Sequence, residues 1–132
     1  MISLDTNVLI RYVVRDNAVQ SQLASGLIDR CVADGHPAVV TLLAVLETEW
    51  VLRSAYHYSK RQILAIFAGL LESENLHIEN EAVLERTLEL WPRRTVNFAN
   101  CLILAQSLAL GCNMVTLDKR ASKLPGATLL RA

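Results

Sequence analysis

The 132-residue chain is poor in aromatic residues and cysteines and carries no net charge. Its two Phe, two Trp and three Tyr residues predict a core built mainly from Leu, Val, Ile and Ala. Because 13 basic residues balance 13 acidic ones, a strong global field that would hold nucleic acid is excluded. Any attraction to RNA must therefore be local.

The three cysteines form no CxxC pair, which excludes a common zinc motif and suits a reducing cytoplasm. Cys101 stands in an apolar run and is expected to act as a small buried hydrophobe. The chain starts with a predicted strand that reaches Asp5, so we expect no signal peptide. No apolar run approaches the roughly 18 residues of a membrane span. We therefore expect a cytoplasmic protein with no membrane contact.

The hydrophobic pattern predicts short strands alternating with helices. Strands are expected over 1–4, 37–40, 76–78, 113–117 and 128–130, and helices over 8–14, 18–33, 42–55, 60–71, 81–91 and 97–110. This order predicts an α/β protein with a central parallel sheet of four or five strands, flanked by helices on both faces. No linker or repeat interrupts it, so residues 1–132 are expected to form one domain.

Two predicted strands end in an aspartate, although the chain has only five aspartates. Asp5 follows the first strand and Asp118 follows the strand over 113–117. Open parallel sheets bind ligands at the carboxyl ends of their strands, so both residues are candidate ligands. The alternative is that each one caps the following turn or helix.

Glu47 is a third candidate, on the helix predicted over 42–55. Its neighbours at helical spacing are Leu43, Leu46, Trp50 and Val51, which predicts a buried face. A buried carboxylate needs a cation, either a basic side chain or a metal ion. Glu49, by contrast, is expected to form an exposed pair with Arg53 four residues later.

Asp5, Glu47 and Asp118 together would offer hard oxygen ligands for Mg²⁺ or Mn²⁺. Such an ion can generate hydroxide and clamp a phosphodiester. No Ser/His/Asp relay competes with this interpretation, because the three histidines are scattered and expected at the surface (His36, His57, His77). GxxxxGK[ST] and GxGxxG motifs are absent.

Four segments in order resemble the PIN domains of VapC toxins. They are Leu4-Asp5-Thr6-Asn7-Val8-Leu9, the segment over 46–53, the segment over 97–105, and Val115-Thr116-Leu117-Asp118-Lys119-Arg120. The resemblance implies a ribonuclease whose acidic residues bind Mg²⁺ or Mn²⁺. Asp5, Glu47 and Asp118 match the first, second and last acids of the family, and Thr6, Asn7 and Thr116 match groups that orient water or metal. The resemblance also implies a homodimer and a partner antitoxin of the VapB type. Only the antitoxin would bring the toxin–antitoxin complex to promoter DNA.

Asn100 departs from this family pattern, which normally has an aspartate there and often another at Asn97. Asn97 is expected to cap the helix over 97–110. Asn100 is isosteric with Asp but uncharged, so we expect the catalytic and metal-binding set Asp5, Glu47, Asn100 and Asp118 to bind its ion weakly. Either the chain is a natural variant, or the aspartate was changed to silence a toxic enzyme.

Three other functions remain open on sequence grounds. The first is a non-catalytic PIN module that binds antitoxin or RNA, for which Asn100 argues. The second is an aspartyl phosphatase, which needs an acid where Asn7 stands, and the third is a structural domain without a site. For a nuclease, the expected RNA contacts are Arg93, Arg94, Lys119 and Arg120. An apolar stripe over 63–71 is expected to face either the sheet or an antitoxin.

Overall fold

The fold was obtained as a computed structural model that describes residues 1–93 and 95–131. The predicted RNA contact Arg94 lies outside the described residues. The chain divides into two compact units, Met1–Glu79 and Asn80–Ala132, and each is described by itself. The helices formed by the described residues all lack the length and apolar character that crossing a membrane requires.

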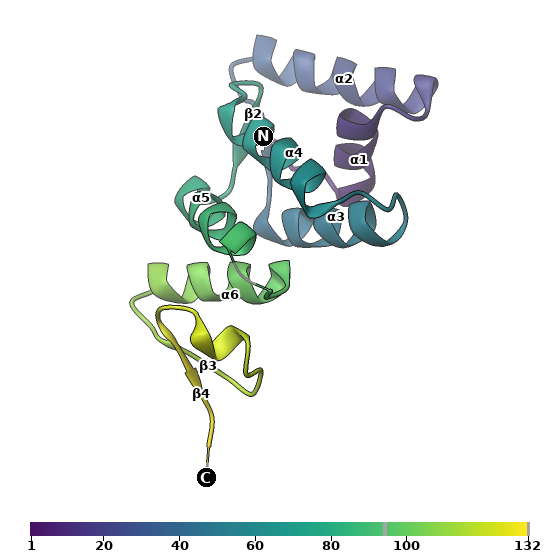
Figure 1. The fold of residues 1–132 in the computed structure, drawn as a ribbon. Helices are drawn as coiled ribbons and strands as arrows, with labels where there is room; N and C mark the ends of the chain where they lie inside the picture. The colour runs from purple at the N-terminus through teal and green to yellow at the C-terminus, as the bar shows by residue number, and fades with distance from the viewer. Residues whose placement is uncertain (94, 132) are drawn as a thin grey trace. The chain divides into compact units, whose positions relative to one another are not determined.

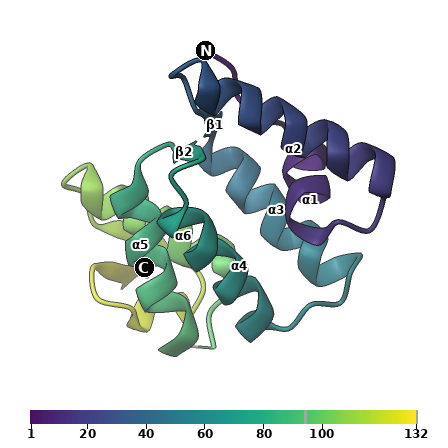
Figure 2. The ribbon, with the colours of Figure 1, turned by 90° about the horizontal axis from the view of Figure 1, so that it is seen from above.

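The first unit consists of four helices and a small parallel sheet (Figures 1 and 2). Its helices are α1 (Thr6–Val14), α2 (Ala18–Ala33), α3 (Leu42–Ser54) and α4 (Lys60–Glu72), and its strands are β1 (Ala38–Val40) and β2 (Leu76–Ile78). α1 packs against both α2 and α3, while α3 also contacts α4. The core of this unit therefore lies among the four helices and one face of the sheet.

β1 and β2 pair in parallel, with Val39 opposite His77. The predicted first strand is reduced to a single parallel bridge between Ser3 and Val39. Backbone hydrogen bonds of 2.9 and 2.8 Å flank this bridge, so the chain start runs beside β1 and delivers Asp5 to its carboxyl end. Ala38 and Val40 are buried, Val39 is half-buried and His77 is exposed. The face of this sheet that carries Val39 and His77 is therefore less buried than the sequence predicted for a sheet flanked by helices on both faces.

The second unit consists of α5 (Glu81–Leu90), a short 3-10 turn η1 (Trp91–Arg93), α6 (Phe98–Ala109), β3 (Met114–Thr116), a second turn η2 (Ala121–Lys123) and β4 (Ala127–Leu129). α6 contacts α5 and β3, and β3 pairs in parallel with β4 (Figure 1). Trp91 and Phe98 meet edge to face, with ring centroids 4.9 Å apart. This aromatic pair joins the end of α5 to the start of α6.

The predicted α/β class and parallel pairing are confirmed. Within the described residues, the four strands pair as β1 with β2 and β3 with β4, instead of forming one hydrogen-bonded sheet of four or five strands. Most helix and strand bounds agree with the sequence pattern to within two residues, and α2 and β2 have the predicted bounds. The histidines are exposed and Cys101 is buried, as expected.

Side-chain caps explain why the helices begin where they do. Five of the helices start at a residue whose side-chain oxygen accepts a first-turn amide, namely Asp5, Asn17, Thr41, Ser59 and Asn97. Such caps stabilise a helix by about 0.5–2 kcal/mol each relative to alanine. The helix starts are therefore encoded locally in the sequence.

Candidate active site

Asp5, Thr6, Asn7 and Glu47 lie in one open cavity of about 270 Å³ in the first unit. The cavity lies where the chain start ends beside β1 and where α1 and α3 both begin. Thr41, the cap of α3, also lines it. The N-terminal ends of two helices therefore face the same space as two carboxylates. Helix N-termini carry a partial positive charge that favours anions such as phosphate.

Asp5 has one oxygen engaged and one available. Its Oδ1 accepts the amide of Val8 at 3.0 Å, which caps α1. The side chain is exposed, and among the described residues its second oxygen accepts no hydrogen bond. The capping alternative and the ligand hypothesis are thus compatible, because one carboxylate can serve both purposes.

The prediction that Glu47 lies on a buried face is wrong. Glu47 is exposed, as are Leu43 and Trp50 on the same side of α3, at 78% and 58% exposure. The face that α3 buries instead carries Val45, Thr48, Glu49 and Leu52. Apolar neighbours at helical spacing therefore did not indicate burial here. Glu47 remains a candidate ligand because it lines the cavity with Asp5, and not because burial demands a cation.

Glu49 is the buried acid of α3, and this also corrects the sequence-based interpretation. The predicted pair with Arg53 is present, with Nε 2.8 Å from one carboxylate oxygen and Nη2 3.4 Å from the other. The Glu49 side chain, however, is only 4% exposed, whereas that of Arg53 is 54% exposed. The hydrogen bond with Glu49 raises the pKa of Arg53. Glu49 is thus neutralised within its own helix.

Glu79 is a residue near the site that sequence reasoning missed. Its Oε1 accepts the amide of Leu42 at 2.9 Å, so it supplements the Thr41 cap at the start of α3. Glu79 directly follows β2, and no local pattern relates it to a helix that begins 37 residues earlier. It adds a third carboxylate to the polar groups around the start of α3.

The second unit brings Asn100 and Asp118 together. The Nδ2 of Asn100 donates to Oδ2 of Asp118 at 3.3 Å. The other oxygen of Asp118 accepts the amides of Arg120 at 2.8 Å and Ala121 at 3.0 Å. Thr116 supports this turn, since its hydroxyl accepts the amide of Asp118 at 3.0 Å. The uncharged amide of Asn100 thus contacts Asp118 at a position where a second carboxylate would repel the Asp118 carboxylate.

Asn97 caps α6 as expected, with Oδ1 accepting the amide of Asn100 at 2.8 Å. The three expected RNA contacts that the structure describes, Arg93, Lys119 and Arg120, are all exposed. Arg93 lines a second cavity of about 190 Å³ with Arg86 and Glu89. Lys119 and Arg120 follow Asp118 directly in the chain.

The oxygen-bearing side chains of the 270 Å³ cavity fit a hard divalent cation. Asp5 and Glu47 supply carboxylates, and Thr6, Asn7 and Thr41 supply hydroxyl and amide oxygens. These are the oxygen ligands that Mg²⁺ and Mn²⁺ prefer. Within residues 1–93 and 95–131, no three His, Cys, Asp or Glu side chains are grouped closely enough to hold an ion by themselves. The convergence of Asp5, Glu47, Asn100 and Asp118 on one pocket stays a prediction.

The parallel strand pairs, their helices and the carboxylates at strand ends define an α/β protein with a candidate cation site. Comparison with known families is specific: a model of the PIN domain matches residues 2–127. The chain belongs to the PIN domain family. Among solved structures it is similar to a toxin-antitoxin complex from Klebsiella pneumoniae, with 19% identity, coverage of 97% of this chain and 96% of that chain, and a TM-score of 0.35. No curated protein matches the chain.

Proposed function

We propose that this PIN domain, spanning residues 1–132, is a metal-dependent endoribonuclease that acts as the toxin of a type II toxin–antitoxin pair. The observation that carries the proposal is the cavity that Asp5 and Glu47 share at the start of α1 and α3. PIN domains are generally metal-dependent nucleases, and the four segments that resemble VapC toxins point to RNA as the substrate.

Asp5 and Glu47 would hold Mg²⁺ or Mn²⁺ in the first unit, and Asp118, with Asn100 beside it, would contribute from the second. When bound, the ion supplies a hydroxide at neutral pH and charge stabilisation at the phosphodiester. Thr6, Asn7 and Thr116 would orient water and the ligating oxygens. The N-terminal ends of α1 and α3 would attract the phosphate, and Arg93, Arg94, Lys119 and Arg120 would contact flanking phosphates.

The test is RNA cleavage by the purified chain in Mn²⁺ or Mg²⁺, compared with the variants Asp5→Asn and Glu47→Gln. Asn caps a helix as well as Asp, so Asp5→Asn should leave α1 intact. Loss of a metal ligand should lower the rate by about 100-fold or more, which corresponds to several kcal/mol of lost charge stabilisation. Asp29→Asn, an exposed change on α2, is the matched control and should cleave like the parent. EDTA should abolish cleavage.

A non-catalytic PIN module is the second candidate, and the Asn100–Asp118 hydrogen bond favours it. An amide paired with Asp118 satisfies that carboxylate without a cation. The variant Asn100→Asp distinguishes the two functions, because a silenced nuclease should gain metal-dependent cleavage. If neither the parent nor this variant cleaves RNA in Mn²⁺, the chain is a binding module and the nuclease proposal fails.

The proposed partners are a VapB-type antitoxin and a second copy of the chain. The apolar stripe of α4 does not offer the docking surface, because Ile63, Phe67 and Leu70 belong to the core. Leu43 and Trp50 expose apolar area on the side of α3 that carries Glu47, which supports coverage by another chain. Sedimentation mass with and without the antitoxin tests this. A monomer that keeps full activity with antitoxin bound would contradict it.

A further inference from the structure

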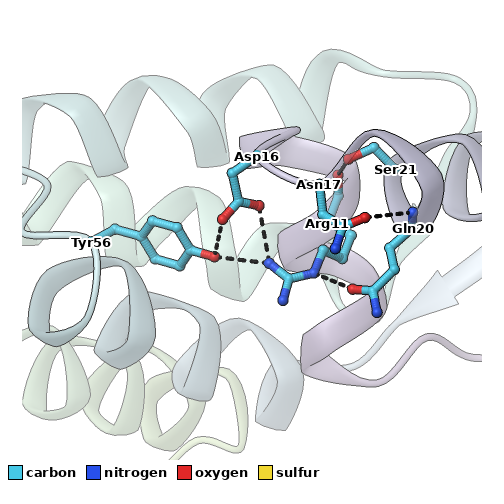
Figure 3. A network of polar contacts seen from close by, with 6 residues as sticks. All are labelled: Arg11, Asp16, Asn17, Gln20, Ser21 and Tyr56. Atoms are coloured by element: carbon cyan, nitrogen blue, oxygen red, sulfur yellow. Dashed lines mark hydrogen bonds and ion pairs between the residues drawn. The ribbon is translucent and has the colours of Figure 1, made fainter.

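Polar side chains join the C-terminal ends of the two helices that begin at the acidic cavity, the 270 Å³ space that Asp5 and Glu47 share. Both α1 and α3 start at this cavity, and the two helices pack against each other. Arg11 lies in the last turn of α1, and Tyr56 follows the end of α3 by two residues. The side chains of Arg11 and Tyr56 meet in a hydrogen bond (Figure 3).

The contacts around the Arg11 guanidinium form a closed set. Its Nη1 donates to Oδ1 of Asp16 and to the hydroxyl of Tyr56, both at 3.0 Å, and its Nε donates to Oε1 of Gln20 at 2.6 Å (Figure 3). The Tyr56 hydroxyl in turn donates to Oδ2 of Asp16 at 2.9 Å. Arg11, Asp16 and Tyr56 are therefore each bonded to both of the others. We call the four residues the Arg11 network.

Stability alone does not account for this network. The side chains of Arg11 and Asp16 are 30% and 42% exposed, and ion pairs this open to solvent contribute little to the free energy of folding. Leu9 and Ile10 already bury the inner face of α1, and apolar burial has no preferred direction. Connected hydrogen bonds to a planar guanidinium do have fixed directions. The Arg11 network therefore adds a defined placement of α1 relative to the segment after α3.

The other end of α1 is held by the backbone. The amide of Leu4, one residue before Asp5, donates to the carbonyl of Val39 at 2.9 Å. With 9 residues, α1 is shorter than the roughly 12–15 residues that an isolated helix needs, so tertiary contacts must hold it. A short helix held at one end alone can pivot about that end. The Arg11 network supplies a second attachment point, beyond the end of α3.

We propose that Arg11, Asp16 and Tyr56 are positioning residues that hold the carboxylates of Asp5 and Glu47 at the separation a divalent cation requires. This inference rests on the proposed metal-dependent function and extends it to side chains that do not line the acidic cavity. Site geometry must be held to within about 0.5 Å, and residues that support metal ligands typically change metal affinity by about 10–100-fold. The three side chains act on the cation site only through α1 and α3.

The first test is Mn²⁺ binding to the whole chain, measured by calorimetric titration, with the variant Tyr56→Phe. This change removes one hydroxyl and keeps the ring, and burial raises the pKa of that hydroxyl, so the charge at pH 7 is unchanged. Mn²⁺ should bind about tenfold more weakly, the lower end of the range for supporting residues, because the network acts through a helix. Tyr58→Phe is the matched control and should bind Mn²⁺ like the parent. Tyr58 is also half-buried, and its hydroxyl forms no hydrogen bond among the described residues.

Two further variants separate positioning from stability and from charge. Ile63→Val removes a methylene from a fully buried core residue on α4, so it should lower the urea midpoint and preserve the Mn²⁺ affinity of the folded protein. Tyr56→Phe should lower both. Arg11→Lys keeps the positive charge but loses the planar fork of donors, so it should weaken Mn²⁺ binding as Tyr56→Phe does. Unchanged affinity in Arg11→Lys would assign Arg11 an electrostatic role and overturn the proposal.

The second test needs no metal. The amide of Val8 donates to Oδ1 of Asp5, so its NMR shift reports the position of that carboxylate. In EDTA, Tyr56→Phe should move the Val8 shift and Tyr58→Phe should not. An unmoved Val8 shift would overturn the proposal, as would an unaltered Mn²⁺ affinity of Tyr56→Phe when the parent binds Mn²⁺ and cleaves RNA. A parent that binds no Mn²⁺ would instead refute the proposed function itself.

Discussion

Replacing Asn100 with aspartate would place two carboxylates side by side, since the Asn100 amide nitrogen is 3.3 Å from Oδ2 of Asp118. Two like charges about 4 Å apart repel by about 1 kcal/mol in bulk water and about 4 kcal/mol at an effective dielectric constant of 20. The lower value applies best because Asp118 is exposed. Loss of the hydrogen bond destabilises the fold by a further amount of about 0.5–1.5 kcal/mol. A negative charge in the first turn of α6 stabilises that helix by about 0.3–1 kcal/mol, which offsets part of this loss. The net expectation without metal is a destabilisation of about 1 kcal/mol.

Urea unfolding at low ionic strength, in EDTA and in excess MnCl₂, measures this effect. Asn100→Asp should be less stable than the parent in EDTA and should gain more stability from Mn²⁺, because the ion removes the repulsion. Asn97→Asp is the matched control, since Asp and Asn cap helices equally well and Asn97 does not contact Asp118 in a hydrogen bond. If Asn100→Asp matches the parent in EDTA and gains nothing from Mn²⁺, the two side chains do not form part of a cation site.

Three further predictions concern other parts of the molecule. Arg53→Ala should lower the free energy of unfolding by more than about 1 kcal/mol, the upper end of the range for exposed ion pairs, because it leaves the carboxylate of Glu49 buried and uncompensated. Chemical denaturation would show this loss, and an effect below about 0.5 kcal/mol would contradict it. The hydrogen bond with Tyr56 is the main cause that lowers the pKa of Asp16. The contribution of Asp16 to stability is therefore fully present above the pKa of the unfolded chain, about 3.9, and is lost as the pH falls through the lower pKa of the folded protein. Asp16→Asn should therefore reduce the loss of stability measured between about pH 6 and pH 2, and an unchanged acid dependence would count against the network. Arg93→Ala should weaken RNA binding across sequences and reduce the slope of log affinity against log salt by about 1, whereas an unchanged slope would leave Arg93 as a solvated surface charge.

The sequence predicted the local features of this fold well and the long-range ones poorly. The bounds of α2 and β2 follow from hydrophobic periodicity and from caps such as Asn17, which act over a few residues. The face of α3 could not be predicted in this way, because apolar residues occur on both sides of that helix. Which side is buried depends on how α1 and α4 pack against it.

The same distinction holds for the candidate site. Asp5 and Asp118 could be identified because each directly follows a strand-like segment, and Asn100 because it departs from a family pattern. Glu79 and the Arg11–Tyr56 contact could not, since they join residues 37 and 45 positions apart with no repeating pattern between them. Contacts of this kind become visible only once the chain is folded.

The double use of Asp5 bears on how such a protein can lose activity through mutation. One of its oxygens holds the first turn of α1, so most replacements should remove about 0.5–2 kcal/mol of helix stability together with any bound ion. Glu47 is exposed and caps nothing, so its replacement should leave the fold intact. Inactive but well-folded variants should therefore arise more readily at Glu47 than at Asp5. At Asp5, asparagine should be the substitution tolerated best, because it retains the cap.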